Sequence, residues 1–174
     1  MLELPRLLLD FFDAGGSVLW LILLLTVTLW TLILGRLVFF FSDYPSLRDN
    51  VLQRWEQRND KTSWYGESMR KQWVSELDCA LGLHLKLIPS LIALLPMLGL
   101  LGTVTGMIQV FDVLALTGAG NPRSMADGVS AATIPTMAGM VAALSALPVS
   151  AALERKYQKE MRKIKDQMPS EVLI

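Results

Sequence analysis

The sequence predicts an all-α membrane protein whose chain crosses the bilayer three times. Of its 174 residues, 52% are hydrophobic, and the mean hydropathy of +0.42 is too high for an ordinary soluble domain, whose surface needs charge. Residues 17–41, 87–116 and 124–153 each contain a single ionisable side chain. About 20 apolar residues in a helix suffice to cross the hydrocarbon core, so each stretch is long enough to span it.

The first span follows a short segment of mixed character. In residues 1–16, leucine and phenylalanine are interspersed with acidic side chains and Arg6, a pattern typical of a helix that lies in the membrane interface. Residues 17–41 then form the first span. Arg36 is close enough to its end for the guanidinium to reach the interface, so we expect an anchor in preference to a role in an ion path.

Residues 42–86 are the only substantial polar segment. Pro45 is expected to end the first helix, because proline lacks the backbone donor that a helix needs. Apolar residues then recur at helical spacing, as they do from Trp73 to Leu85, and predict two amphipathic helices. A segment of this length cannot bury a core of its own. We therefore expect these helices to pack on extensions of the membrane helices or on a neighbouring subunit.

Small residues mark one face of the second span, residues 87–116. Gly99, Gly102, Thr103 and Gly106 fall three and four apart, so they share one side of a helix, and Gly102 and Gly106 form a G-x-x-x-G pattern. Such a face lets another helix approach closely. It predicts close contact with a neighbouring helix.

The third span, residues 124–153, is also rich in small residues, among them Gly139. This composition predicts a helix that packs against other helices on most sides. Residues 117–123 are the short turn that precedes it. Residues 154–174 continue it as a strongly charged helix and a tail.

Lysine and arginine are concentrated on one side of the predicted spans. They flank or occupy residues 42–86 and follow the third span, whereas only Arg6 and Arg123 fall on the other side. Because positive residues collect in the cytoplasm, we expect the N-terminus outside and the C-terminus inside.

The ionisable residues argue against several kinds of site. One cysteine and one histidine do not make a zinc or haem site, and no phosphate-binding motif is present. We therefore expect no metal, no other cofactor and no enzyme. A self-contained proton channel needs a carboxylate or histidine within the membrane. The second and third spans have none at mid-depth.

Hydroxyl groups are the main polar side chains of these two spans. Thr103 lies near the middle of the second span and Thr136 in the first half of the third, so antiparallel helices bring them to comparable depth. Two interpretations carry equal weight from the residues alone. Each hydroxyl bonds its own helix one turn earlier, or both face a lumen or partner helix and guide water or a carboxylate that another protein supplies.

Two stretches resemble a known family. LGLLGTVTGM at residues 98–107 resembles the second-helix signature of the ExbB/TolQ/MotA proton-channel family, and GVSAATIPTMAGMVAALSALP at residues 128–148 resembles its third-helix pattern. With the number of spans and the charged middle segment, the chain is most similar to a short ExbB of a TonB system. Ala131 is a departure, because many members carry a glutamate there.

The resemblance implies an assembly and partners. It implies a homopentameric ring in the bacterial inner membrane, with a periplasmic N-terminus and helices extended into the cytoplasm. The ring would enclose an ExbD-like dimer whose intramembrane aspartate carries protons. Motion of that dimer would pass through a TonB-like protein to outer-membrane receptors for iron complexes or haem. Thr103 and Thr136 match the threonines near that aspartate, and Ala131 leaves the partner as the sole acidic carrier.

Other interpretations remain open at this point. One is a TolQ-like or stator-like subunit of the same family. Another, of a different class, is a non-conducting membrane scaffold that holds partner helices or lipids.

Overall fold

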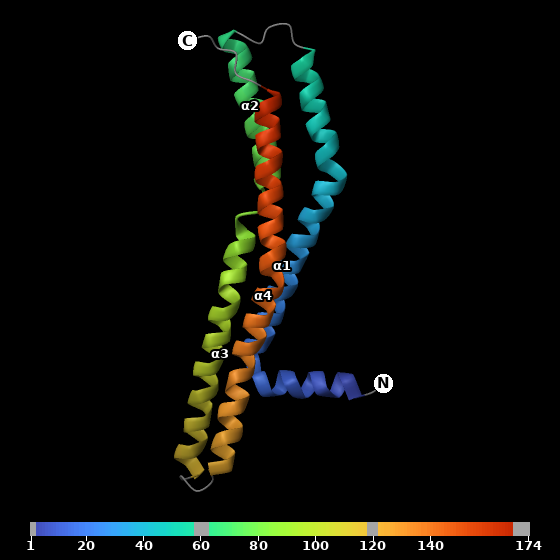
Figure 1. The fold of residues 1–174 in the computed structure, drawn as a ribbon. Helices are drawn as coiled ribbons and strands as arrows, with labels where there is room; N and C mark the ends of the chain where they lie inside the picture. The colour runs from blue at the N-terminus through green and yellow to red at the C-terminus, as the bar shows by residue number, and fades with distance from the viewer. Residues whose placement is uncertain (1–2, 58–62, 118–121, 169–174) are drawn as a thin grey trace. The chain divides into compact units, whose positions relative to one another are not determined.

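A computed structural model describes residues 3–57, 63–117 and 122–168 of the chain. This described part is all helical, with α1 (Glu3–Glu56), α2 (Trp64–Gly82), α3 (Leu87–Thr117) and α4 (Pro122–Gln167) following one another along the sequence (Figure 1). Three helical segments are long and apolar enough to cross a membrane: Gly16–Glu56, Trp64–Ala115 and Gly128–Gln167. The predicted all-α class with three candidate spans is therefore confirmed.

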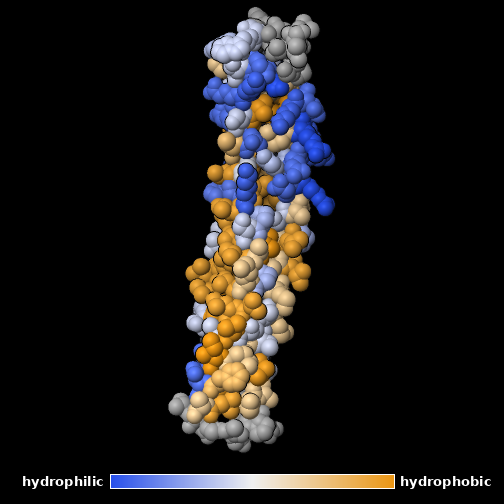
Figure 2. Space-filling model, turned by 90° about the vertical axis from the view of Figure 1, so that its left-hand side faces the viewer, coloured by the Kyte–Doolittle hydropathy of each residue, from blue (hydrophilic) through white to orange (hydrophobic). Residues whose placement is uncertain are grey.

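Contacts divide the chain into two units. Residues 1–30 and 89–148 form the first, called here the membrane unit, and residues 31–88 and 149–174 form the second, called here the charged unit. On the face drawn in Figure 2, hydrophobic side chains cover most of the membrane unit, whereas hydrophilic side chains gather over the charged unit. Many large apolar side chains of the membrane unit are exposed, for example Leu24, Val141 and Leu144, as expected where lipid replaces water as the solvent.

Gly16 divides α1 into two helical segments. Its backbone has φ 63° and ψ −164°, a combination that is essentially restricted to glycine because a Cβ would clash. The helical residues before Gly16 leave the line of the residues that follow it (Figure 1). Gly16 is the last residue of the predicted N-terminal segment, and the place of that segment in the membrane interface stays a prediction.

Pro45 does not end the first helix, so that expectation is wrong. It lies inside α1, which continues to Glu56. A proline removes one backbone hydrogen bond, but it does not prevent a helix from continuing when packing stabilises both sides. Tyr44 and Trp55, on either side of Pro45, are both buried. The first of the two expected amphipathic helices is therefore an extension of α1.

The charged unit has a core of its own. Leu77 and Leu81 of α2, and Met161 and Ile164 of α4, are buried. The rings of Trp55 on α1 and Trp73 on α2 meet edge to face, with 6.4 Å between their centroids. The helices of the middle segment thus pack on the extensions of α1 and α4, which is one of the two arrangements expected from the sequence.

Local signals explain where α2 begins and ends. Ser63 caps its start, because Ser63 Oγ accepts a hydrogen bond from the backbone N of Tyr65 at 3.3 Å. At its other end, the backbone N of Leu83 donates to Cys79 O at 3.0 Å. His84 then adopts a positive φ of 59°, an uncommon conformation for a residue other than glycine. This turn connects α2 to α3.

Candidate functional site

The glycines of α3 face α4 at very short range within the membrane unit. A Cβ added to Gly99 would lie 2.8 Å from Thr136 Cα, and one added to Gly106 would lie 2.7 Å from Ala132 Cβ. A Cβ added to Gly102 would overlap the ring of Pro135. Ordinary carbon contacts are longer than this, so larger side chains at these positions would force the helices apart.

Gly139 provides the same closeness from the side of α4. A Cβ on Gly139 would lie 2.5 Å from Leu95 O and 3.5 Å from Gly99 Cα. The glycines of both helices therefore interdigitate along one seam. This seam brings the backbones near enough for side chains to reach polar atoms of the opposite helix.

Thr136 makes such a contact. Its Oγ1 donates a hydrogen bond to the carbonyl oxygen of Gly99 on α3 at 2.8 Å. The bond joins the two helices, so Thr136 follows neither interpretation made from the sequence. A hydroxyl has one proton and two acceptor sites. With its proton directed at Gly99, Thr136 retains acceptor capacity towards a further donor.

Thr103 behaves differently. Its Oγ1 donates to the carbonyl oxygen of Leu100 in its own helix at 2.8 Å, the local bond that threonine commonly makes in helices. The residue of α3 that meets Thr136 is Gly99, which lies four positions, or about 6 Å of helix rise, before Thr103. Both threonines are half-buried. Their place in a proton path stays a prediction.

The helices around this seam carry no titratable group at the depth of Thr136. The sequence has no Asp, Glu, His, Lys or Arg in residues 87–111 or 128–153. Ala131, half-buried on α4, supplies no carboxylate. The seam therefore offers hydroxyl and carbonyl oxygens but no group of its own that takes up and releases a proton near neutral pH.

A buried polar cluster connects α1 to α4 in the charged unit, beyond the apolar segments. Tyr44 OH donates to Glu160 Oε2 at 2.9 Å, and Lys163 Nζ donates to Glu160 Oε1 at 2.7 Å. Burial by itself would raise the pKa of the Glu160 carboxyl, but the hydrogen bonds from Lys163 and Tyr44 outweigh it and hold this pKa below its ordinary value.

Sequence reasoning missed this cluster, although a signal for it exists. Glu160 interrupts a stripe of buried apolar residues on α4 that includes Leu153, Met161 and Ile164. A carboxylate inside such a stripe requires partners. The position of Tyr44 next to Pro45 gave no indication that it would supply one.

A second polar contact joins α4 to α2. Tyr157 OH donates to Asp78 Oδ1 at 2.5 Å. This hydrogen bond, with burial, raises the pKa of Tyr157 to about 12. Lys156 Nζ lies 4.1 Å from the centroid of the Phe41 ring, a favourable contact between a cation and an aromatic face. These contacts hold α4 against its neighbours in the charged unit.

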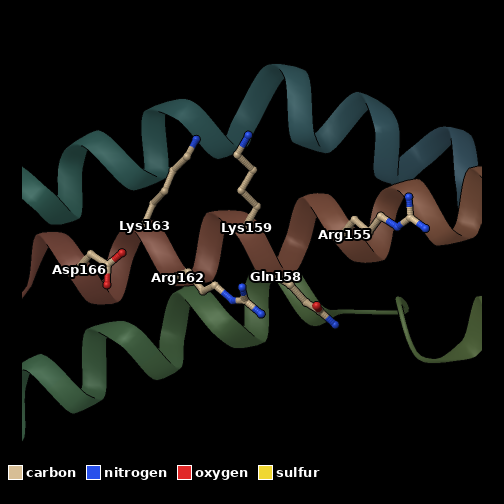
Figure 3. A pocket seen from close by; sticks show the side chains of 6 residues that line it. All are labelled: Arg155, Gln158, Lys159, Arg162, Lys163 and Asp166. Atoms are coloured by element: carbon tan, nitrogen blue, oxygen red, sulfur yellow. The ribbon is translucent and has the colours of Figure 1, made fainter.

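A basic surface follows α4 beyond these contacts. Four cationic side chains surround an open hollow of about 370 Å³ together with Gln158 and Asp166: Arg155, Lys159, Arg162 and Lys163. In Figure 3, Lys159 and Lys163 extend in one direction and Arg162 in another. The spread side chains give a solvated positive surface that favours anions without enclosing one.

Comparison with known proteins places the chain in a family. The model of the MotA/TolQ/ExbB proton channel family matches residues 45–166. The chain belongs to this family. The family resemblance predicted from LGLLGTVTGM is therefore confirmed, and the matched range contains both Thr103 and Thr136.

Several relatives are biopolymer transport proteins by name. The chain is 43% identical over 79 residues to the ExbB-like 1 protein of Synechocystis sp., covering 44% of this chain and 31% of that one. It is 34% identical over 93 residues to exbB1 of Vibrio cholerae, covering 53% and 41%. An ExbB-like 1 protein of Helicobacter pylori is 26% identical over 163 residues, covering 84% and 86%. The chain thus spans less than half the length of the first two relatives.

These findings together describe a multi-pass membrane protein of a proton-channel family. The matched family is one of proton channels. The distances along the seam between α3 and α4 describe how the two helices pack, and none of the compared proteins assigns the seam a role.

Proposed function

We propose that the chain is an ExbB-like subunit of an inner-membrane motor driven by the proton-motive force. With an ExbD-like single-span partner and a TonB-like protein, it energises uptake of iron complexes or haem across the outer membrane. Family membership and the names of the relatives support transport of this type. In this proposal five copies form a ring, with N-termini in the periplasm and the ends of α4 in the cytoplasm.

One observation carries the proposal: the spans that form the seam contain no titratable side chain at the depth of Thr136. A proton that crosses the hydrocarbon core needs a group that binds and releases it. That group must then come from a second polypeptide. The neutral glycine-rich seam fits a ring that surrounds such a partner, because small residues permit close helix contacts.

Thr136 has a defined part in this proposal. Its proton is directed at Gly99 O, so its oxygen is available to accept a hydrogen bond from the protonated carboxyl of the partner. Hydrogen bonding to the neutral form of an acid raises its pKa. The contact thereby helps the acid take up a proton at a depth where its ionised form is unfavourable. Thr103 contributes in the same way from α3.

The decisive experiment measures proton flux through reconstituted protein. The full chain is placed in liposomes alone, with an ExbD-like partner, and with a partner whose intramembrane aspartate is replaced by asparagine. Decay of an imposed pH gradient is followed with an entrapped dye. We expect flux only in the second sample.

Threonine variants then test the path. Thr103→Ala combined with Thr136→Val is compared with Thr133→Val, a matched control. Thr133 is exposed and its Oγ1 bonds Ser130 O of its own helix at 2.7 Å. The double variant should slow partner-dependent flux, and the control should not.

Three results contradict the proposal. Flux by the chain alone, at a rate equal to that of the complex, would place the proton carrier in this chain. No flux with any ExbD-like partner, despite a stable complex, would favour a scaffold. Flux with normal iron uptake but a defect in envelope constriction after gene deletion would instead indicate a TolQ-like subunit.

A further inference from the structure

Arg36 on α1 is a buried cation that forms no ion pair in the part of the chain that the structure describes. Only 6% of it is exposed. Its Nη1 donates to the carbonyl oxygen of Ala80 at 3.1 Å, and its guanidinium carbon lies 5.3 Å from the centroid of the Phe39 ring. Nε and Nη2 are buried without a hydrogen-bond partner among the described residues.

In this arrangement, no opposite charge among the described residues compensates the positive charge of Arg36. A buried charge is unfavourable unless an opposite charge and hydrogen bonds compensate it. A guanidinium presents its donors in a planar fork that matches two oxygens of a phosphate or carboxylate. The single bond to Ala80 uses one donor of that fork. Neutral acceptors would satisfy the two free donors, but only an anion would also compensate the charge.

A cavity of about 350 Å³ adjoins this side chain within the charged unit. Its walls include Arg36, Leu32, Gly35, Phe39, Leu83 and His84. Most of these walls are apolar, with a cation on one side and an imidazole on another. His84 occupies its place with a φ of 59°, a strained conformation of the kind that is often retained at ligand sites.

The position of the cavity indicates what kind of anion fits. Arg36 precedes the first acidic residue after the span, Asp43, by seven positions, which is about 10 Å of helix rise. The predicted first span ends at residue 41, five positions after Arg36, so the long arginine side chain can reach the boundary between acyl chains and headgroups. Leu83, which lines the cavity, is more than half exposed, so apolar surface continues beside it.

We propose that this cavity binds the phosphate group of an anionic phospholipid. The guanidinium turns from the Phe39 ring towards the cavity, and Nε and Nη2 donate to two phosphate oxygens. His84 borders the headgroup, and the acyl chains lie against Leu83 and the apolar walls of the cavity.

The test measures lipid binding to the full chain, purified in mild detergent and freed of lipid. Native mass spectrometry counts bound phosphatidylglycerol, phosphatidylcholine and, in a separate arm, inorganic phosphate. Arg36→Gln removes the cation. Gly35→Leu fills the cavity while keeping Arg36, because nothing lies within 4 Å of a Cβ at Gly35. Arg48→Gln is the matched control, since Arg48 pairs with Asp49 on the surface.

We expect phosphatidylglycerol to bind about tenfold or more tightly than phosphatidylcholine. Both lipids offer phosphate oxygens, but the choline cation cancels the phosphate charge, so only phosphatidylglycerol brings the net negative charge that compensates a buried cation. Arg36→Gln and Gly35→Leu should each abolish the preference, and Arg48→Gln should retain it. If Arg36→Gln does not fold, Gly35→Leu alone decides.

Three results would overturn the proposal. The first is equal binding of the two lipids, or an unchanged preference in Gly35→Leu. The second is displacement of the lipid by inorganic phosphate at the same concentration, which would indicate a soluble anion. The third is a loss of oligomer in Arg36→Gln without a change in bound lipid, which would assign the missing anion to a carboxylate of a second copy.

Discussion

Replacement of Gly99 by alanine should separate α3 from α4 in the membrane unit. The new methyl group would lie 2.8 Å from Thr136 Cα and 3.1 Å from Pro135 O. To reach an ordinary contact of 3.4 Å, the backbone of α4 must retreat by about 0.6 Å. This movement lengthens the bond from Thr136 Oγ1 to Gly99 O, now 2.8 Å, to about 3.4 Å, beyond the normal range for a hydroxyl donor.

The magnitude follows from these two effects. Overpacking a close contact costs about 1–3 kcal/mol, and a hydrogen bond between membrane helices contributes about 0.6 kcal/mol. We therefore expect Gly99→Ala to lower the free energy of unfolding by about 2 kcal/mol or more. Reversible unfolding by SDS in mixed micelles, followed by far-UV circular dichroism, measures this difference.

Gly35→Ala is the matched control for this measurement. It also places a methyl group on a helical glycine, but nothing lies within 4 Å of that position. Alanine should therefore be neutral there, or stabilise by about 0.5–1 kcal/mol through its greater helix propensity. If both variants change stability equally, close contact at Gly99 is not what holds the two helices together, and the reasoning is refuted.

Three further predictions use the same unfolding assay. Thr136→Val should destabilise by about 0.6 kcal/mol through loss of a bond between helices, and more than Thr103→Val, whose bond lies within α3; an equal effect would contradict this. Gly16→Ala should lower the free energy of unfolding by about 1–3 kcal/mol. The cost comes from the φ of 63°, because nothing lies within 4 Å of an added Cβ that could clash with it. A neutral result would show that the backbone at Gly16 can relax. The lowered pKa of Glu160 means that its ionised form stabilises the fold above the ordinary value of 4.5, and that this contribution is lost as the pH falls through the lowered value. Glu160→Gln should reduce the loss of free energy of unfolding that accompanies a fall in pH. If the variant and the original chain show the same dependence of stability on pH from 3 to 7, this role of Glu160 is contradicted.

The spans were predictable because the membrane imposes a simple requirement on the sequence. Long stretches with one ionisable residue each suffice to identify them. The glycine face of α3 was predictable for a similar reason, since residues three and four apart share one side of any helix. In the structure these glycines meet Pro135, Thr136 and Ala132 on α4.

Other features depended on contacts that no local pattern specifies. Pro45 has the local character of a helix terminator, yet α1 passes through it because Tyr44 and Trp55 are buried on either side. Glu160 is a typical surface residue by type, yet it is buried with Tyr44 and Lys163 as its partners. Tyr44 hydrogen-bonds Glu160 on α4 and Trp55 meets Trp73 on α2, so in each case a residue distant in sequence supplies the stabilising interaction.

By itself, the sequence determined the class of this protein: its helices, the number of its apolar segments and the family to which its glycine and threonine motifs belong. Hydropathy and helical period are properties of single segments, so they can be read along the chain. Only the tertiary structure decided that Thr136 bonds Gly99 rather than its own helix, and that Arg36 is buried beside Ala80 and a cavity. Those outcomes depend on the register between helices, which packing sets and which the period of one helix does not contain.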